Sequence, residues 1–178
     1  MREQFVCKSP VGYIYCSFTG GALSSLDIRP RGRVPAGRFS PEQKRLRDEL
    51  DDYFSGKGQA FTQPLRFSSG TPFQQQVWRM LLTIPFGETR SYQWLAESVG
   101  RPKAARAVGQ AVGKNPLPLI VPCHRIIAFD GSLGGFSCGL PVKKWLLKHE
   151  KSECGMQDSG RRCPGGQFAL HPGRSHLI

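Results

Sequence analysis

The sequence predicts an α+β protein with a small N-terminal unit that combines strands with one helix, followed by a mainly helical C-terminal unit. Residues 1–30 alternate polar and apolar side chains between glycine-containing turns, which is typical of antiparallel hairpins. From residue 72 on, apolar residues recur at steps of three and four, the period of a helix packed on a core. The polar segment S-S-G-T-P at 68–72 separates the two patterns. We therefore expect a structural unit, a second unit that carries the chemistry and a flexible tail, at 1–70, 71–151 and 152–178.

The N-terminal unit is expected to contain strands, a basic loop and one helix. F-V-C-K, Y-I-Y-C-S-F and the stretch after the Gly-Gly turn predict three successive strands, and R-P-R-G-R-V-P-A-G-R-F is too rich in proline and glycine for regular structure. Ser40 before Pro41 is typical of a helix start, and this helix should run to about Phe54. Its apolar stripe, which includes Tyr53, is expected to serve packing alone. A further short strand is predicted over 60–67.

The C-terminal unit is expected to hold four helices. Capping and stop signals place them at 72–82, 92–99, 103–113 and 141–151. The second and third, joined by a short turn, form a helix-turn-helix pattern. On the third, Ala104, Val108 and Ala111 can pack inward, which leaves an outer face made of Lys103, Arg106, Gln110 and Gly113. Such a basic face with small residues suits a DNA minor groove, and the alternative is an ordinary amphipathic helix with solvated charges.

The formal net charge of +12 favours an acidic polymer as partner. The excess of Lys and Arg over Asp and Glu is densest in residues 73–150. Because a basic surface can also serve solubility, charge alone makes nucleic-acid binding plausible and no more. No apolar run approaches the roughly 18 residues of a membrane span, so we expect no membrane partner.

The cysteines predict free thiols. Six of them occur without a C-x-x-C pair, and the N-terminus lacks the apolar core of a signal peptide. We therefore expect a reducing compartment, the cytoplasm, or the nucleus in a eukaryote. We expect no metal: four residues toward the C-terminus have the ligand types for zinc but match no standard spacing, namely Cys154, Cys163, His171 and His176.

The most informative stretch is L-P-L-I-V-P-C-H-R-I-I at 117–127. Its apolar run is expected to form a strand that delivers Cys123, His124 and Arg125 in succession. A thiol becomes a strong nucleophile as its thiolate, and an adjacent histidine or cation can lower the pKa of a cysteine. A buried structural cysteine fits the same residue types, and composition does not separate the two interpretations.

P-C-H-R-I-I, with N-P-L-P-L-I-V before it and G-G-F-S-C-G-L after it, closely resembles the active-site segment of the O6-alkylguanine-DNA alkyltransferases, the methylated-DNA–protein-cysteine methyltransferases. The resemblance runs from about residue 72 to residue 150. It implies a ribonuclease H-like sheet with a helix in the N-terminal unit, and action as a monomer on double-stranded DNA that contains O6-alkylguanine. It also implies transfer of the alkyl group, chiefly methyl, to the protein without metal or cofactor, once per molecule.

The resemblance implies five catalytic residues. Cys123 accepts the alkyl group, His124 draws off the thiol proton through a bound water, and Glu150 orients the histidine. Asn115 holds the turn that carries the cysteine. Tyr92 helps turn the phosphate and donates a proton toward the base. A nucleophile, a base and an orienting carboxylate follow the logic of many hydrolases.

The resemblance also implies a DNA face and a guanine pocket. Arg106 should enter the base stack from the minor groove, where the damaged nucleotide has been flipped out, with Tyr92 beside it. The other residues expected at the DNA are Lys103, Ala105, Gln110 and Arg125. The residues expected to line the pocket are Pro118, Ser137, Tyr92 and Ile126. The Ser137 backbone amide should meet the O6 atom.

Two other function classes stay open at this point. A non-catalytic protein of the same fold that senses alkylated DNA would lack the cysteine, so Cys123 argues against it. A cysteine hydrolase that uses Cys123 and His124 is awkward, because neighbours on a strand point to opposite faces. Cys138 stands where relatives often carry glycine or a bulky residue, so the range of accepted alkyl groups stays open.

Overall fold

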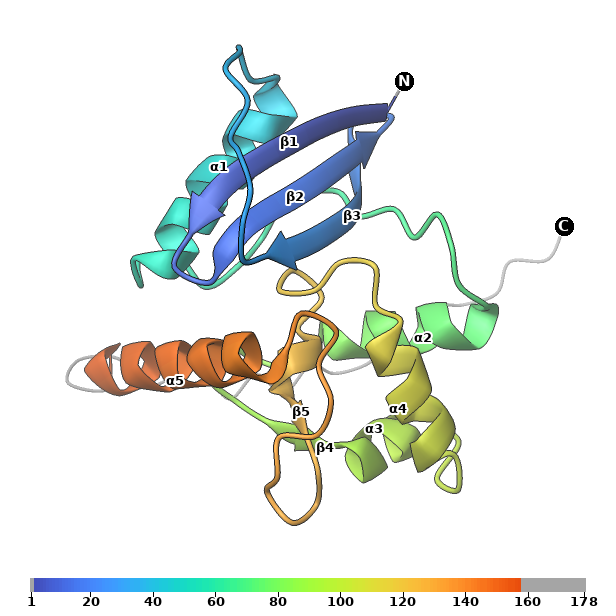
Figure 1. Ribbon diagram of the computed structural model, residues 1–178. Coiled ribbons are helices and arrows are strands. Elements are labelled where there is room, and N and C mark those ends of the chain that lie inside the picture. Colours follow the sequence, from blue (N-terminus) through green and yellow to red (C-terminus); the bar gives the residue numbers. More distant parts are fainter. Residues whose placement is uncertain (1, 158–178) are drawn as a thin grey trace, which may run out of the picture.

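The computed structural model describes residues 2–157, in which an antiparallel sheet with one helix lies against a group of helices (Figure 1). The strands are β1 (Arg2–Ser9), β2 (Gly12–Thr19) and β3 (Ala22–Arg29), hydrogen-bonded in the order β1-β2-β3. The three predicted strands are thus confirmed. Gly12 turns the chain between β1 and β2 with φ +124°, where a Cβ atom would lie 2.4 Å from the Arg29 carbonyl oxygen, so only glycine fits.

Helix α1 (Pro41–Phe54) covers one face of the sheet (Figure 1). The Ser40 side chain accepts a hydrogen bond from the Gln43 backbone N–H, and the Gln43 side chain accepts one from the Ser40 N–H. This reciprocal cap, with Pro41 in the first turn, satisfies two free donors of the helix start and explains why the predicted boundaries hold. The buried residues of α1 include Leu46, Leu50 and Tyr53.

The short strand predicted over 60–67 is wrong. The segment makes one bridge to the edge of β3, where the Leu23 N–H donates to the Pro64 carbonyl at 2.8 Å and the Arg66 N–H donates to the Leu23 carbonyl at 2.9 Å. Pro64 has no N–H to continue a ladder, so the pairing stops after this bridge. The segment therefore ties the sheet to the connection into the next helix without becoming a strand.

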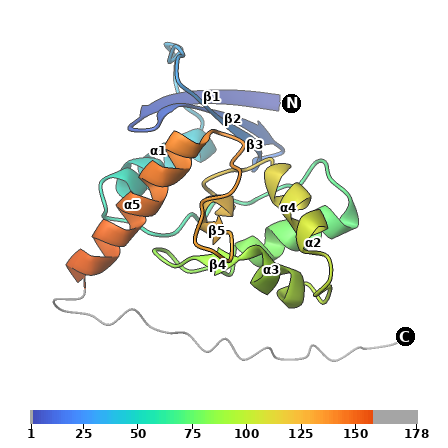
Figure 2. The ribbon, with the colours of Figure 1, turned by 60° about the horizontal axis from the view of Figure 1, so that its bottom comes forward.

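The C-terminal helices are α2 (Pro72–Leu81), α3 (Tyr92–Ser98), α4 (Ala105–Gly113) and α5 (Leu140–Gln157). A short parallel pair, β4 (Arg90–Ser91) with β5 (Ile126–Ile127), lies between α5 and α3 (Figure 2). Buried side chains of the sheet, of α1 and of these helices form one continuous core. Among the described residues, no helix is long and apolar enough to cross a membrane.

Two of the predicted helix boundaries differ from the structure. Helix α4 begins at Ala105, not at residue 103, because Ala104 still adopts a non-helical conformation. Helix α5 continues to Gln157, six residues beyond the predicted end, since the sequence after 151 carries no proline or strong stop signal until Gly155. The rest of the predicted tail, 158–178, lies outside the described residues.

Helix α5 lies beside α1 (Figure 2), where the rings of Phe54 and Trp145 are 5.7 Å apart. The buried side of α5 carries Lys143, Leu146 and Glu150, whereas the neighbouring Val142, Trp145 and His149 are only half-buried. Two charged side chains therefore enter the interior from one helix face.

Replacing Trp78 by phenylalanine should loosen the packing of α2 on α4. The Trp78 ring is buried, and its indole N–H donates to the Ala111 carbonyl at 2.8 Å. The variant removes this hydrogen bond and leaves a gap in the core where the larger ring was, so we expect urea denaturation to give a free energy of unfolding about 2–4 kcal/mol lower. The half-buried Trp94, changed to phenylalanine, is the control and should cost less than about 1 kcal/mol.

Candidate functional site

The predicted cysteine strand is a turn. The Asn115 side chain closes it by donating to the Val121 carbonyl at 2.8 Å and accepting from the Leu117 N–H at 3.0 Å. The Leu26 N–H of β3 donates to the Pro116 carbonyl at 2.8 Å, which fixes the turn against the sheet. Leu119 adopts φ +76°, a conformation that residues other than glycine rarely take. Asn115 thus supports a strained turn, and its predicted place there agrees with these contacts.

The strand prediction failed because Pro118 and Pro122 interrupt the apolar run, Pro116 precedes it, and none of the three can donate a ladder hydrogen bond. In this stretch only Ile126–Ile127 (β5) pairs as a strand, and Cys123–Arg125 forms a single 3₁₀ turn, η1. Consecutive residues of a 3₁₀ turn do not alternate between two faces as strand residues do. Cys123 and His124 are consequently both buried, with 2% and 0% of their surface exposed.

Burial raises the pKa of the Cys123 thiol to about 12, with a smaller opposing effect from a hydrogen bond to Asn115. A further rise comes from Cys138, and the positive charge of Lys143 lowers the value slightly. The thiol is therefore protonated at neutral pH in the protein alone, unlike the low-pKa cysteine that its neighbours in sequence could have produced. Chemistry at this sulfur needs a base that takes its proton at the moment of reaction.

The Glu150 carboxylate, 1% exposed, is the most densely hydrogen-bonded group of the site. Its Oε1 atom accepts from Tyr53 Oη at 2.7 Å, from His124 Nε2 at 2.8 Å and from Arg125 Nη2 at 3.0 Å. Its Oε2 atom accepts from Arg125 Nε at 2.9 Å and from the Gly87 N–H at 3.1 Å. Burial by itself would raise the pKa of Glu150, but His124 and Arg125 hold it well below its usual range. The group is therefore ionised.

The ionised carboxylate determines the tautomer of His124. Because Glu150 can only accept, His124 Nε2 carries the hydrogen of their bond. Burial lowers the pKa of His124, so the ring is neutral and its Nδ1 atom is bare. Within residues 2–157 this Nδ1 atom is buried and has no hydrogen-bond partner. His124 Nδ1 can therefore accept a proton, and the hydrogen bond from Nε2 to Glu150 fixes the orientation of the ring.

Arg125 does not lie where a DNA contact requires it, and that prediction is wrong. The side chain is buried, pairs with Glu150 through two nitrogens and donates through Nη1 to the Ile84 carbonyl at 2.6 Å. A guanidinium with this many fixed partners serves as the counter-charge of the carboxylate. Its place at the DNA was inferred from the resemblance, and the sequence does not show that Arg125 has a buried partner 25 residues further on.

Two functional side chains escaped the sequence analysis. Lys143 is completely buried and donates to the carbonyls of Ile126, at 2.6 Å, and Leu133. It holds the loop after η1 against α5. Its spacing of three and seven residues from Leu146 and Glu150 was the available signal, since all three share one helix face. Tyr53 was assigned to packing, and no local signal marks its hydroxyl as a partner of Glu150.

Tyr92, the first residue of α3, lies between two glycines. Ideal Cβ atoms at Gly109 of α4 and at Gly134 of the glycine-rich loop would come within 3.7 Å and 3.0 Å of its ring or hydroxyl. Burial, and then the charge of a Cys123 thiolate, raise the pKa of Tyr92, which keeps its hydroxyl protonated. The Tyr92 hydroxyl therefore carries its proton at neutral pH and lies in the neighbourhood of the cysteine.

The other predicted pocket residues differ in exposure. Pro118 and Ile126 are buried, and Ser137 is exposed with its hydroxyl 3.9 Å from the Cys138 sulfur. Ile126 contributes its carbonyl to Lys143, while its side chain belongs to the core. Burial raises the pKa of Cys138 as well, so this second thiol is also protonated.

The predicted basic face of α4 is exposed. Val108 and Ala111 point into the core as expected, joined by Val112. Lys103, Arg106 and Gln110 lie on the surface, and Ala105 is half-buried. One long charged side chain, Arg106, thus projects from α4 among smaller outer residues, and Lys103 lies just before the helix begins.

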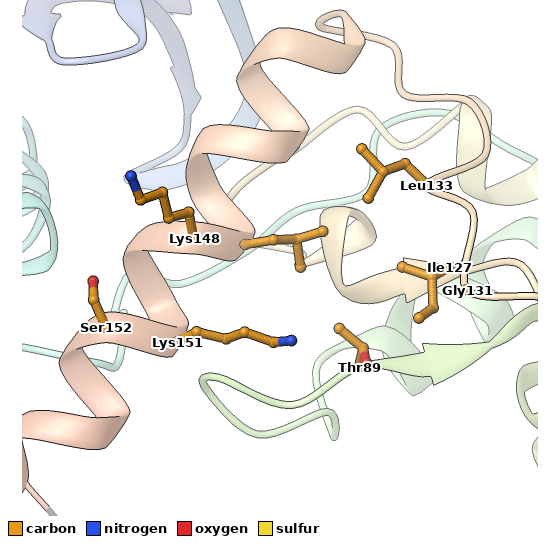
Figure 3. A pocket seen from close by; sticks show the side chains of 8 residues that line it. Thr89, Ile127, Gly131, Leu133, Lys148, Lys151 and Ser152 are labelled. Carbon is orange, nitrogen blue, oxygen red and sulfur yellow. The ribbon is translucent and has the colours of Figure 1, made fainter.

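A separate cavity of about 570 Å³ lies between α5, the loop after β5 and Thr89 (Figure 3). Lys151 extends from α5 toward Thr89, and Lys148 points the other way. Its walls are mainly apolar and contain none of the predicted site residues. In residues 2–157 there is also no group of three or more His, Cys, Asp and Glu side chains placed to hold a metal ion. Cys163, His171 and His176 lie outside the described residues.

Comparison with known proteins decides the family. The profile described as 6-O-methylguanine DNA methyltransferase, DNA binding domain, matches residues 72–152. The chain is 41% identical over 155 residues to the methylated-DNA–protein-cysteine methyltransferase of Methanosarcina barkeri, a match that covers 83% of this chain and 96% of the relative. The chain belongs to the methylated-DNA–protein-cysteine methyltransferase family. The protein of the same name from Mycobacterium bovis is 43% identical over 148 residues, 81% of this chain and 89% of the relative.

Solved structures agree with this family. The crystal structure of Mycobacterium tuberculosis O6-methylguanine methyltransferase matches with a TM-score of 0.73 and 39% identity over 86% of this chain and 94% of that chain. Mycobacterium tuberculosis OGT in complex with DNA matches with a TM-score of 0.75 and 42% identity, covering 83% and 92%. The family suggested by the motif, the enzyme class and the mixed α/β fold class are confirmed. The ribonuclease H-like character of the sheet stays a prediction.

Replacing Glu150 by glutamine should destabilise the protein strongly. The variant keeps the side-chain shape but leaves the buried Arg125 guanidinium without its counter-charge. Breaking one side of a buried ion pair costs about 3–5 kcal/mol, which we expect as the fall in the free energy of unfolding measured with urea at pH 7.5. Glu153→Gln, one turn further along α5, is the matched control and should change this value by less than about 1 kcal/mol.

Acidification should lower stability in two stages. The pKa of His124 is depressed by burial, so the unfolded chain takes up a proton that the native state refuses once the pH falls below about 6.5. The depressed pKa of Glu150 adds a second loss below about pH 4. Urea denaturation at several pH values should show the first stage in the wild type and not in His124→Gln. Equal free energies of unfolding for the wild type at pH 7.5 and 5 would contradict this assignment.

Proposed function

We propose that this protein repairs O6-alkylguanine, chiefly O6-methylguanine, in double-stranded DNA by moving the alkyl group irreversibly onto the Cys123 sulfur. The observation that carries the proposal is the neutral His124 beside the buried thiol, with a bare Nδ1 and an Nε2–H held by Glu150. The names of the relatives, which describe cysteine methyltransferases of methylated DNA, support the substrate.

The transfer needs one displacement and one proton path. His124 Nδ1 takes the thiol proton through a bound water, and the resulting thiolate attacks the alkyl carbon. The bond between this carbon and sulfur forms while the bond between the carbon and O6 breaks. The leaving guanine receives a proton from the Tyr92 hydroxyl, because a neutral base departs more readily than its anion. The thioether is stable, so each molecule reacts once, and no metal or cofactor takes part.

The DNA is held by α3 and α4, which we propose act as a helix-turn-helix at the minor groove. Arg106 fills the space in the base stack that the flipped nucleotide leaves, and the other contacts come from Lys103, Ala105 and Gln110. Small residues on α4 let its backbone approach the duplex closely. The flipped guanine enters beside Pro118 and Tyr92 and meets the Ser137 backbone amide. The protein acts as a monomer inside the cell, with 1–70 as a structural unit and 71–151 as the unit that binds DNA.

The decisive test is the intact mass of the protein after incubation with a duplex that carries one O6-methylguanine. A gain of one methyl group per molecule, located on Cys123 by peptide mapping, is expected. A Cys123→Ser variant should bind the same duplex and gain no mass, because a hydroxyl is a far weaker nucleophile than a thiolate.

Two controls make the result specific. Unmodified duplex should leave the mass unchanged, and Cys138→Ser should react as the wild type does. Tight binding of the lesion with no mass change would overturn the proposal in favour of a protein that senses alkylated DNA. A methyl group on Cys138 would overturn the assignment of the acceptor.

A further inference from the structure

Tyr53 hydrogen-bonds to Glu150, the carboxylate that also binds His124, from a different part of the chain. It lies near the end of α1, within the first 70 residues, whereas the other donors to Glu150 come from residues 87, 124 and 125. The Tyr53 hydroxyl donates to Glu150 Oε1 at 2.7 Å, and both side chains are almost completely buried. The N-terminal unit thus contributes a hydrogen bond to the active site itself.

The ring of Tyr53 is fixed on several sides, so its hydroxyl has one direction. It packs edge-on against Phe54 and Phe86, with centroid distances of 5.2 Å and 5.8 Å, and lies 5.5 Å from Phe61. The His149 ring is 5.4 Å away, and its Nε2 donates to the Tyr53 carbonyl at 2.7 Å. A hydroxyl on such a rigid ring can set the position of the group that it binds.

The oxygen that Tyr53 binds is the one that orients His124. Glu150 Oε1 accepts from Tyr53, His124 and Arg125 together. Each donor reduces the negative charge on the carboxylate oxygen, so this oxygen stabilises a protonated histidine less strongly. Removing one donor should shorten and strengthen the bond from His124 and make the ring easier to protonate.

We propose that Tyr53 is a positioning residue for methyl transfer, whose hydroxyl limits the pull of Glu150 on His124 and so keeps the histidine neutral with a free Nδ1. This proposal rests on the proposed function, since it assigns the neutral histidine the role of base. A purely structural tyrosine would lower stability when changed and would leave the protonation of His124 as it was.

Among the described residues, charged and titratable groups approach His124 and Glu150 from three elements. From α1 comes Tyr53, from η1 come Cys123 and Arg125, and from α5 come Lys143, His149 and, beside Gly87, Cys154. Arg125 and Lys143 both oppose a charge on His124, and Tyr53→Phe removes neither of these positive charges. A shift in the titration of His124 in a Tyr53 variant therefore reports the hydroxyl.

The first readout is the rate of single-turnover methyl transfer as a function of pH. Tyr53→Phe keeps the packed ring and removes only the hydroxyl. We expect the acidic limb of its profile, where protonated His124 is inactive, to move upward by about half to one pH unit. Tyr15→Phe, a change on β2 away from Glu150, is the matched control and should give the wild-type profile. Superimposable profiles for Tyr53→Phe and wild type would overturn the proposal.

The second readout is independent of repair activity. With ¹⁵N-labelled histidine, NMR follows the titration of the four histidines in the protein alone, and His124→Gln identifies the signal. Tyr53→Phe should raise the pH at which His124 takes up a proton, by the same amount as the rate profile moves. An unchanged titration with a lower melting temperature would make Tyr53 structural. If the wild type transfers no methyl group, the proposed function fails, and the NMR shift still decides whether Tyr53 acts on His124.

Discussion

The Glu150 carboxylate is the point on which the site depends. It hydrogen-bonds, from α5, to Tyr53 of α1, to the backbone of the loop at Gly87 and to two residues of the 3₁₀ turn after Pro122. A buried charge is costly unless every oxygen lone pair has a donor, and here five hydrogen bonds meet that need. The same bonds leave the carboxylate no freedom to turn or to take a proton. The hydrogen bonds that stabilise the buried carboxylate are therefore the same ones that fix the orientation and tautomer of His124.

In the protein alone Cys123 is a thiol and not a thiolate, because the site around it is buried. The burial that lowers the pKa of His124 also raises the pKa of Cys123, so both groups are uncharged at neutral pH in the protein alone. A buried permanent thiolate would cost stability and invite side reactions such as oxidation. Lys143 holds the following loop and also places a positive charge near the sulfur. This charge stabilises the thiolate, but the thiolate forms only when a base accepts the thiol proton.

Much of this could be predicted from the sequence, and the failures have physical causes. The hairpins, the capped helix starts and the basic face of α4 depend on local patterns and came out as expected. The run around Cys123 has the apolar composition of a strand, but its prolines favour a turn held by Asn115. Arg125 was placed at the DNA because the sequence does not show that its charge is paired with Glu150 in the interior. Tyr53 was assigned to packing because its partner Glu150 lies 97 residues away in the sequence. Contacts of that range leave no periodic trace in a single sequence.

The central claim is that the carboxylate of Glu150 prepares His124 to take the thiol proton. The measurement that tests it most directly is the single-turnover rate of methyl transfer from an O6-methylguanine duplex at pH 7.5 for Glu150→Gln, under conditions where circular dichroism shows the variant to be folded. The account predicts a rate lower by about 100-fold, because an amide neither fixes the tautomer nor stabilises the protonated ring, while DNA affinity stays the same. A rate within about threefold of the wild type would contradict it.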